Sequence, residues 1–105
     1  MALHFTDENF NQEVLSSELP VLVDFYADWC GPCKMMSPVL DQLSNELEGQ
    51  IKIGKVNVDD DPELAGQYKV MSIPNFVLIK NGQIVDQVIG AVPKAQMLAK
   101  IQAVL

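Results

Sequence analysis

Residues 21–36 of this chain read VLVDFYADWCGPCKMM, and they contain its only two cysteines and its only tryptophan. The first seven residues, Val21 to Ala27, are apolar on both alternating faces except at Asp24. A strand that is apolar on both faces belongs inside a sheet covered by helices on both sides. Apolar residues at helical spacing then follow the cysteines, namely Met36, Val39, Leu40, Leu43 and Leu47. The sequence therefore predicts two thiols at the point where a buried strand turns into a helix.

Composition limits the class of protein. The chain has 105 residues, of which 49% are hydrophobic, and this fits one compact domain over residues 1–105. It carries 14 acidic residues and 7 lysines, with no arginine, for a formal net charge of −7. That charge argues against nucleic acid or an anionic membrane as the main partner. No apolar run approaches the roughly 20 residues that span a bilayer, and no signal peptide is visible, so we expect a cytoplasmic protein.

Strand and helix patterns alternate along the rest of the chain. Strands are expected at residues 4–5, 21–27, 51–58, 75–80 and 83–89. Helices are expected after Thr6, after the cysteines, from Asp61-Pro62 and from Pro93. Asn81-Gly82, between the last two strands, is a strong hairpin signal. This order predicts an α/β fold in which a parallel strand–helix–strand unit is followed by an antiparallel hairpin, with helices on both faces of the sheet.

The two cysteines are placed for redox chemistry. Cys30 lies at the predicted start of a helix, where unpaired backbone N–H groups and the helix dipole favour a thiolate. Cys33 lies about one turn further on the same face, near enough to close a disulfide. Pro32 restricts the loop and lies in the first turn, where its missing N–H costs least. We expect thiol–disulfide exchange, with Cys30 as the exposed nucleophile and the deeper Cys33 resolving the mixed disulfide.

The spacing of the cysteines alone is equally compatible with half of a zinc site or with two inert thiols. A structural zinc site normally has four protein ligands. Beyond the two cysteines this chain offers only His4, far upstream of Cys30. Zinc therefore ranks well below a redox pair, and we expect no metal.

Asp24 is the one charged residue in the apolar strand before the cysteines. It could be solvated at a sheet edge or be a satisfied structural carboxylate, but its apolar neighbours favour burial. Burial raises the pKa of a carboxyl group, and such a group near Cys33 would take the proton of this thiol during resolution. Lys55, on the next parallel strand, either partners Asp24 or is a surface lysine with a buried stem, and the sequence leaves both open.

Several segments together resemble the thioredoxin family, from about Phe5 to the C-terminus. They are Val23-Asp24-Phe25, Ala27, Trp29-Cys30-Gly31-Pro32-Cys33-Lys34, Pro38, Lys55-Val56-Asn57-Val58-Asp59, Ile73-Pro74, Lys80-Asn81-Gly82 and Gly90-Ala91. The resemblance implies the thioredoxin fold, a central five-stranded mixed sheet flanked by four helices. It also implies a cis bond at Ile73-Pro74, although X–Pro bonds in general prefer trans.

The same resemblance implies a protein-disulfide reductase that needs no cofactor beyond a redox-active disulfide between Cys30 and Cys33. On the burial argument given above, Asp24 and Lys55 would assist these cysteines in catalysis. Family members reduce disulfides in protein substrates and are re-reduced by a thioredoxin reductase, a flavoenzyme that draws on NADPH. The substrate segment would lie in a shallow groove whose positions here are Trp29, Gly31, Pro32, Ile73, Pro74, Gly90 and Ala91.

Two positions depart from the family pattern, and two other functions compete with the reductase. Tyr26 stands where many members have tryptophan, and we expect little effect; Asn75 stands where threonine is common, and it either shifts substrate preference or is neutral. One competing function is a redox-independent binding subunit or holdase that uses the same apolar groove. The other, weaker one is an oxidase or isomerase, but Gly31-Pro32 resembles the reducing members. A monomer is expected, because no exposed apolar stripe demands a partner.

Overall fold

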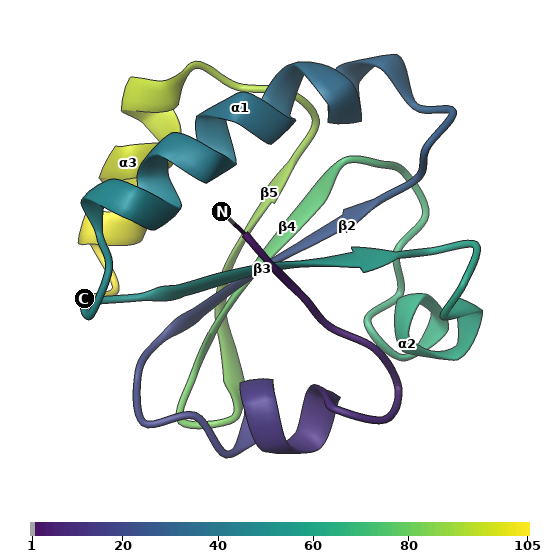
Figure 1. The fold of residues 1–105 in the computed structure, drawn as a ribbon, viewed down its shortest axis with the longest axis horizontal. Coiled ribbons are helices and arrows are strands. Elements are labelled where there is room, and N and C mark those ends of the chain that lie inside the picture. Colours follow the sequence, from purple (N-terminus) through teal and green to yellow (C-terminus); the bar gives the residue numbers. More distant parts are fainter. Residues whose placement is uncertain (1) are drawn as a thin grey trace.

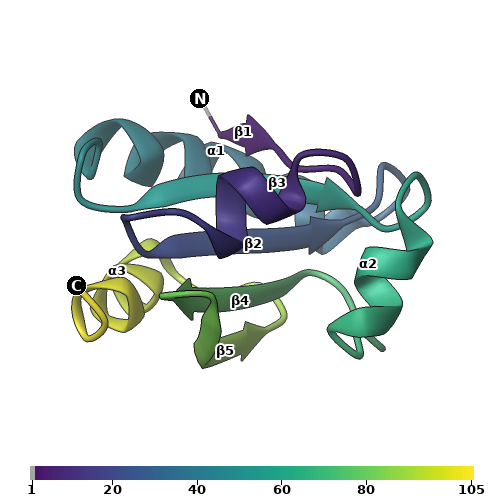
Figure 2. The same ribbon diagram turned by 90° about the horizontal axis from the view of Figure 1, so that it is seen from below.

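A five-stranded mixed sheet forms the centre of the protein, whose computed structural model describes residues 2–105. The strands are β1 (Leu3–His4), β2 (Val21–Tyr26), β3 (Lys52–Asn57), β4 (Asn75–Lys80) and β5 (Gln83–Ile89). Their order in the sheet is β1-β3-β2-β4-β5, which Figure 2 shows from top to bottom. β1, β3 and β2 run parallel, β4 is antiparallel to β2, and β5 is antiparallel to β4. The mixed sheet implied by the sequence is confirmed, with β2 in its middle.

Helices pack on both faces of this sheet. They are a π-helix at Asn11–Leu15, α1 (Gly31–Glu46), α2 (Pro62–Gln67) and α3 (Lys94–Gln102). Figure 1 shows α1 and α3 on one side of the sheet, with the π-helix and α2 on the other. α1 runs without interruption through Pro38. Within residues 2–105, no helix has both the length and the apolar character needed to cross a membrane.

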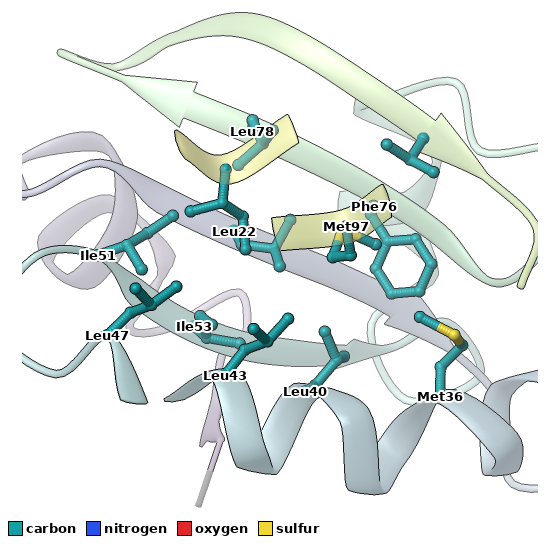
Figure 3. Close-up of a cluster of buried hydrophobic side chains, with 12 residues drawn as sticks. Leu22, Met36, Leu40, Leu43, Leu47, Ile51, Ile53, Phe76, Leu78 and Met97 are labelled. Carbon is teal, nitrogen blue, oxygen red and sulfur yellow. The ribbon is translucent and has the colours of Figure 1, made fainter. Parts of the chain in front are cut away.

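The strict alternation of side chains along β2 divides them between two cores. Val21, Val23 and Phe25 face the π-helix and α2. Leu22 faces α1 and α3, where it packs among the leucines and methionines that Figure 3 shows between α1 and the sheet. Each such fully buried side chain contributes about 1.5–3 kcal/mol to folding. Asp24, two residues after Leu22, therefore projects toward the α1 side.

The hairpin between β4 and β5 turns at Asn81-Gly82, as expected from the sequence. Asn81 has a φ of 54° and Gly82 a φ of 77°, so both central residues are left-handed, as a type I′ turn requires. The ladder shifts register between Leu78 and Ile79. The turn and its register place β5 on the open edge of the sheet, where it leads into the loop before α3.

Asp61 lies at the N-cap of α2 as expected, but its side chain has a different partner. Its Oδ1 accepts a hydrogen bond from the Asp7 backbone N–H at 3.0 Å, and no side-chain bond caps its own helix. Pro62 in the first turn removes one N–H that would otherwise need a cap. The Asp61 carboxylate thus ties the segment after β1 to α2.

Gly54 of β3 has no room for a side chain. A Cβ atom there would overlap the ring of Phe5, which is itself buried. We expect Gly54→Ala to lower the free energy of unfolding by about 1–3 kcal/mol, since overpacking a filled core strains it. Gly66→Ala is the matched control, because its Cβ would meet no atom within 4 Å. Denaturant unfolding measures both, and equal stability of Gly54→Ala and the parent would contradict this packing.

Candidate active site

Cys30 is the N-cap residue of α1, and its sulfur takes the place of a capping oxygen. Its backbone is extended, and Cys33 N donates to Cys30 Sγ at 3.2 Å. Pro32 lies in the first turn, and a side chain at Gly31 would meet open space. A sulfur that accepts a backbone N–H at the positive end of a helix is favoured as an anion. The local fold therefore stabilises a Cys30 thiolate through hydrogen bonding and helix position.

A disulfide joins Cys30 to Cys33, with their Cα atoms 5.2 Å apart. Both residues are buried, Cys30 being 5% and Cys33 3% exposed. The expected contrast between an exposed Cys30 and a deep Cys33 is thus small in the oxidised protein. What distinguishes the two sulfurs is position along α1, since Cys30 Sγ is the one that accepts the N-cap hydrogen bond.

The Ile73-Pro74 loop and the end of β5 meet beside this disulfide. The peptide bond between Ile73 and Pro74 is cis, and Ile73 O lies 3.9 Å from Cys30 Sγ. Gly90 N donates to Pro74 O at 2.8 Å, and Gly90 adopts a left-handed φ of 89°. The Ile73-Pro74 loop thus contacts Cys30 directly and ties the end of β5 to this side of the site.

Two largely apolar pockets are lined by residues close in sequence to the cysteines. Trp29 and Ile73 line a pocket of about 170 Å³ together with Met71, which is 96% exposed. Ala91 lines a second pocket, of about 320 Å³, with the exposed Met35. Trp29 is 70% exposed, and its Nε1 donates to Asp59 Oδ2 at 2.9 Å, which fixes the ring.

Asp24 is fully buried, and neither of its carboxylate oxygens has a hydrogen-bond partner within residues 2–105. It pairs in register with Lys55 of β3 and Phe76 of β4. Burial raises its pKa from 3.8 to about 7, and the positive charge of Lys55 opposes this rise in part. A carboxyl group with a pKa near neutrality is suited to proton transfer at physiological pH.

Lys55 lies opposite Asp24 but is not bonded to it. Its Nζ donates to Ser37 Oγ at 3.0 Å and lies 4.7 Å from the centroid of the Tyr26 ring. Lys55, Ser37, Tyr26 and Cys33 all line a pocket of about 200 Å³ on the α1 side of the sheet. The lysine is half-buried. It therefore has something of both alternatives that the sequence left open. Like a partner of Asp24 it acts on this carboxyl electrostatically, and like a surface lysine it lines a pocket.

Three residues near the site were not predicted from the sequence to take part in it. Ser37 follows Cys33 by four residues, and this spacing, which puts the two side chains on one face of the helix, is the signal that could have found it. Asp59 comes just after β3, at the edge of the sheet where β2 also ends. Met71 precedes the Ile73-Pro74 loop without any pattern that marks it as exposed. The part of the chain that the structure describes contains no cluster of three or more His, Cys, Asp or Glu side chains suited to a metal ion.

Comparison with known proteins gives the family. The thioredoxin family model matches residues 1–103. The chain belongs to the thioredoxin family. It is 53% identical over 96 residues to thioredoxin 1 of Nostoc sp., an alignment that covers 91% of this chain and 90% of that protein. It is 49% identical over 100 residues to the thioredoxin of Synechocystis sp., an alignment that covers 95% of this chain and 94% of that protein. It is 52% identical over 95 residues to the thioredoxin of Haemophilus influenzae, which covers 90% of this chain and 89% of that protein.

Membership of the thioredoxin family and the closed Cys30–Cys33 pair together establish the chemistry. The protein is a thiol–disulfide oxidoreductase that works by dithiol–disulfide exchange. A binding role independent of redox chemistry is not favoured. The thioredoxin fold also accounts for the layers described above, a mixed sheet with helices on both faces.

The burial of Asp24 makes the stability of the protein depend on pH. Its pKa is higher in the folded chain, at about 7, than the ordinary 3.8, so folding favours the neutral carboxyl. Stability from this group is full below the ordinary pKa and is lost as pH rises to the folded pKa. We expect Asp24→Asn to stabilise the fold more at about pH 8.5 than at about pH 5, by about 2–3 kcal/mol.

Denaturant unfolding at the two pH values measures this difference. Asp28→Asn is the control for losing one negative charge, because Asp28 is exposed. An equal change in stability at both pH values for Asp24→Asn would show that the carboxyl is paired or solvated in solution, contrary to the burial described above.

Proposed function

We propose that this thioredoxin reduces disulfide bonds in other proteins, and that Cys30, Cys33, Asp24 and Lys55 carry the reaction. The observation that supports the assignment of roles is the hydrogen bond from Cys33 N to Cys30 Sγ at the start of α1. This hydrogen bond supports Cys30 as the residue that attacks. The substrate would be a disulfide in an extended protein segment.

The first step is attack by the Cys30 thiolate on one sulfur of the substrate disulfide. A bond forms between Cys30 Sγ and that sulfur, the substrate S–S bond breaks, and the other substrate sulfur leaves as a thiolate. The N-cap hydrogen bond lowers the cost of holding the Cys30 thiolate before attack. The product is a mixed disulfide between Cys30 and the substrate.

The second step is resolution by Cys33. Asp24, ionised at the start of this step, accepts the proton of the Cys33 thiol. The Cys33 sulfur then attacks Cys30 Sγ, and the substrate sulfur still bonded to Cys30 leaves with the bonding electron pair. A folded pKa of about 7 for Asp24 supports this role, because such a carboxyl is both available as a base and basic enough near neutral pH. The substrate has gained two electrons and the Cys30–Cys33 disulfide has formed.

The substrate segment would bind along the apolar surface around Cys30. We assign to this groove Trp29, Gly31, Pro32, Ile73, Pro74, Gly90 and Ala91. Pro74 and Gly90 are joined by their backbones, and Trp29 and Ile73 share a pocket wall. Small or apolar side chains of this kind support recognition through the substrate backbone, with weak sequence preference.

A thioredoxin reductase would restore the dithiol, with NADPH as the source of electrons, so that the chain carries electrons between the two partners. The Cys-Gly-Pro-Cys motif that the chain shares with the family supports this electron-transfer role. The redox-active disulfide would be the only redox group needed. We further propose that residues 1–105 act as one monomeric domain in the cytoplasm, without nucleic acid or membrane as a partner. The net charge of −7 supports the last point.

A coupled assay tests the proposed function. Wild-type protein, NADPH, a thioredoxin reductase and insulin should give NADPH oxidation and precipitation of the reduced insulin chain. The Cys30→Ser/Cys33→Ser double variant should give neither. Absence of turnover by the wild-type protein with active reductase would refute the reductase assignment.

Trapping of the intermediate tests the two cysteine roles. Cys33→Ser should accumulate a mixed disulfide through Cys30, because the attacking thiolate is kept and the resolving thiol is lost. Cys30→Ser should form adducts on Cys33 at least about tenfold more slowly, since the Cys33 sulfur lacks the N-cap hydrogen bond. Mass spectrometry of the adducts measures both, and faster adduct formation on Cys33 would reverse the assignment.

A further inference from the structure

The Lys55 ammonium group points to helix α1 and not to the nearest buried anion. Lys55 and Asp24 are direct neighbours on parallel strands. Yet Lys55 Nζ donates to Ser37 Oγ, and neither Asp24 oxygen has a hydrogen-bond partner within residues 2–105. The Tyr26 ring lies below the same ammonium, with its centroid 4.7 Å from Nζ. The Lys55 ammonium is thus held by the Ser37 hydroxyl and the Tyr26 ring, while the Asp24 carboxylate has no cation in contact with it.

A direct contact between Lys55 and Asp24 would change the chemistry of the carboxyl. An ammonium group in contact with a buried carboxylate strongly favours its ionised form. Such a carboxylate would take a proton from a thiol only weakly, because its basicity would be low. At its present position Lys55 lowers the pKa of Asp24, but desolvation by burial outweighs this effect.

Ser37 connects this cation to the resolving cysteine. It follows Cys33 by four residues on α1, so the two side chains lie one above the other on the same helix face. Both line the pocket of about 200 Å³ that Lys55 and Tyr26 also line. The hydroxyl of Ser37 is therefore placed to decide where the ammonium lies relative to the site of proton transfer.

We propose that Ser37 is a positioning residue whose hydroxyl holds the Lys55 ammonium off the Asp24 carboxylate, so that Asp24 remains a competent acceptor for the Cys33 proton. The functional part of this proposal rests on the role given to Asp24 above. The geometric part stands on the Lys55–Ser37 hydrogen bond and on the unpartnered carboxylate.

Few groups that face Asp24 can disturb a test of this proposal. β3 contributes Lys55, and β4 contributes the apolar Phe76. Tyr26 of β2 interacts electrostatically with Asp24, and Cys33 and Ser37 of α1 line the same pocket as Lys55. In the oxidised protein both cysteines are closed in the disulfide and do not titrate. Lys55 is then the charged group whose position governs the ionisation of Asp24.

Carbon-13 NMR of carboxyl-labelled aspartate in the oxidised protein tests the proposal directly, with Asp24→Asn used to assign the resonance. We expect Ser37→Ala to lower the titration midpoint of Asp24 by about one pH unit, a roughly tenfold change in its ionisation constant. The reason is that the released ammonium pairs with the nearest buried anion. Ser37→Thr, which keeps a hydroxyl, should restore the wild-type midpoint.

Lys55→Met provides the control for mechanism. It should raise the midpoint of Asp24, and adding Ser37→Ala to it should then have no further effect, because the cation that Ser37 positions is gone. An unchanged or raised midpoint in Ser37→Ala would overturn the proposal, as would an equal shift in the Lys55→Met background. The titration needs no turnover, so its failure is distinct from a failure of the coupled insulin assay, which would remove the reductase function alone.

Discussion

The site depends on one constraint, the burial of a carboxyl group in the central strand of the sheet. β2 is hydrogen-bonded to β3 on one side and β4 on the other, so Asp24 has no route to solvent along the sheet. Helix α1 closes the remaining face with the core of Figure 3. Desolvation then raises the pKa of Asp24 to about 7. Above that pH the protein carries a destabilising charge on the face of the sheet that α1 covers, and in the proposed mechanism this carboxylate accepts the proton of Cys33.

The thiols and the carboxyl are placed by the same chain segment. β2 carries Asp24, and the turn after it delivers Cys30 to the N-cap of α1. α1 then returns over the sheet, so that Cys33 and Ser37 come to line one pocket with Lys55 of β3. In the proposed mechanism the two steps would use different features of α1. Its first N–H groups would stabilise the attacking Cys30 thiolate, and its buried face would present Cys33, whose proton must be removed.

Much of this arrangement could be predicted from the sequence, because its causes are local. The apolar run at residues 21–27, the Asn81-Gly82 turn and the position of Cys30 before a helix each depend on a few neighbouring residues. The resemblance to thioredoxins, and not the pattern itself, supplied the cis bond at Ile73-Pro74. The partners of Lys55 and Trp29 could not be predicted, because both contacts are tertiary. Ser37 meets Lys55 only when α1 packs on the sheet, and Asp59 meets Trp29 only when β2 and β3 pair in parallel. The near-equal burial of Cys30 and Cys33 was missed for the same reason: exposure depends on the neighbouring Ile73-Pro74 loop as well as on helix position.

The most direct test of the central claim is the rate at which the mixed disulfide is resolved as pH changes. A single-turnover experiment would follow release of a chromophoric thiol from Cys30 in the wild-type protein and in Asp24→Asn, from about pH 5 to about pH 9. The wild-type rate should rise with the ionisation of Asp24, around its pKa of about 7. Asp24→Asn should lose this rise and be slower near neutrality. Equal rates for the two proteins at every pH would contradict the central claim, because Cys33 would then lose its proton without help from Asp24.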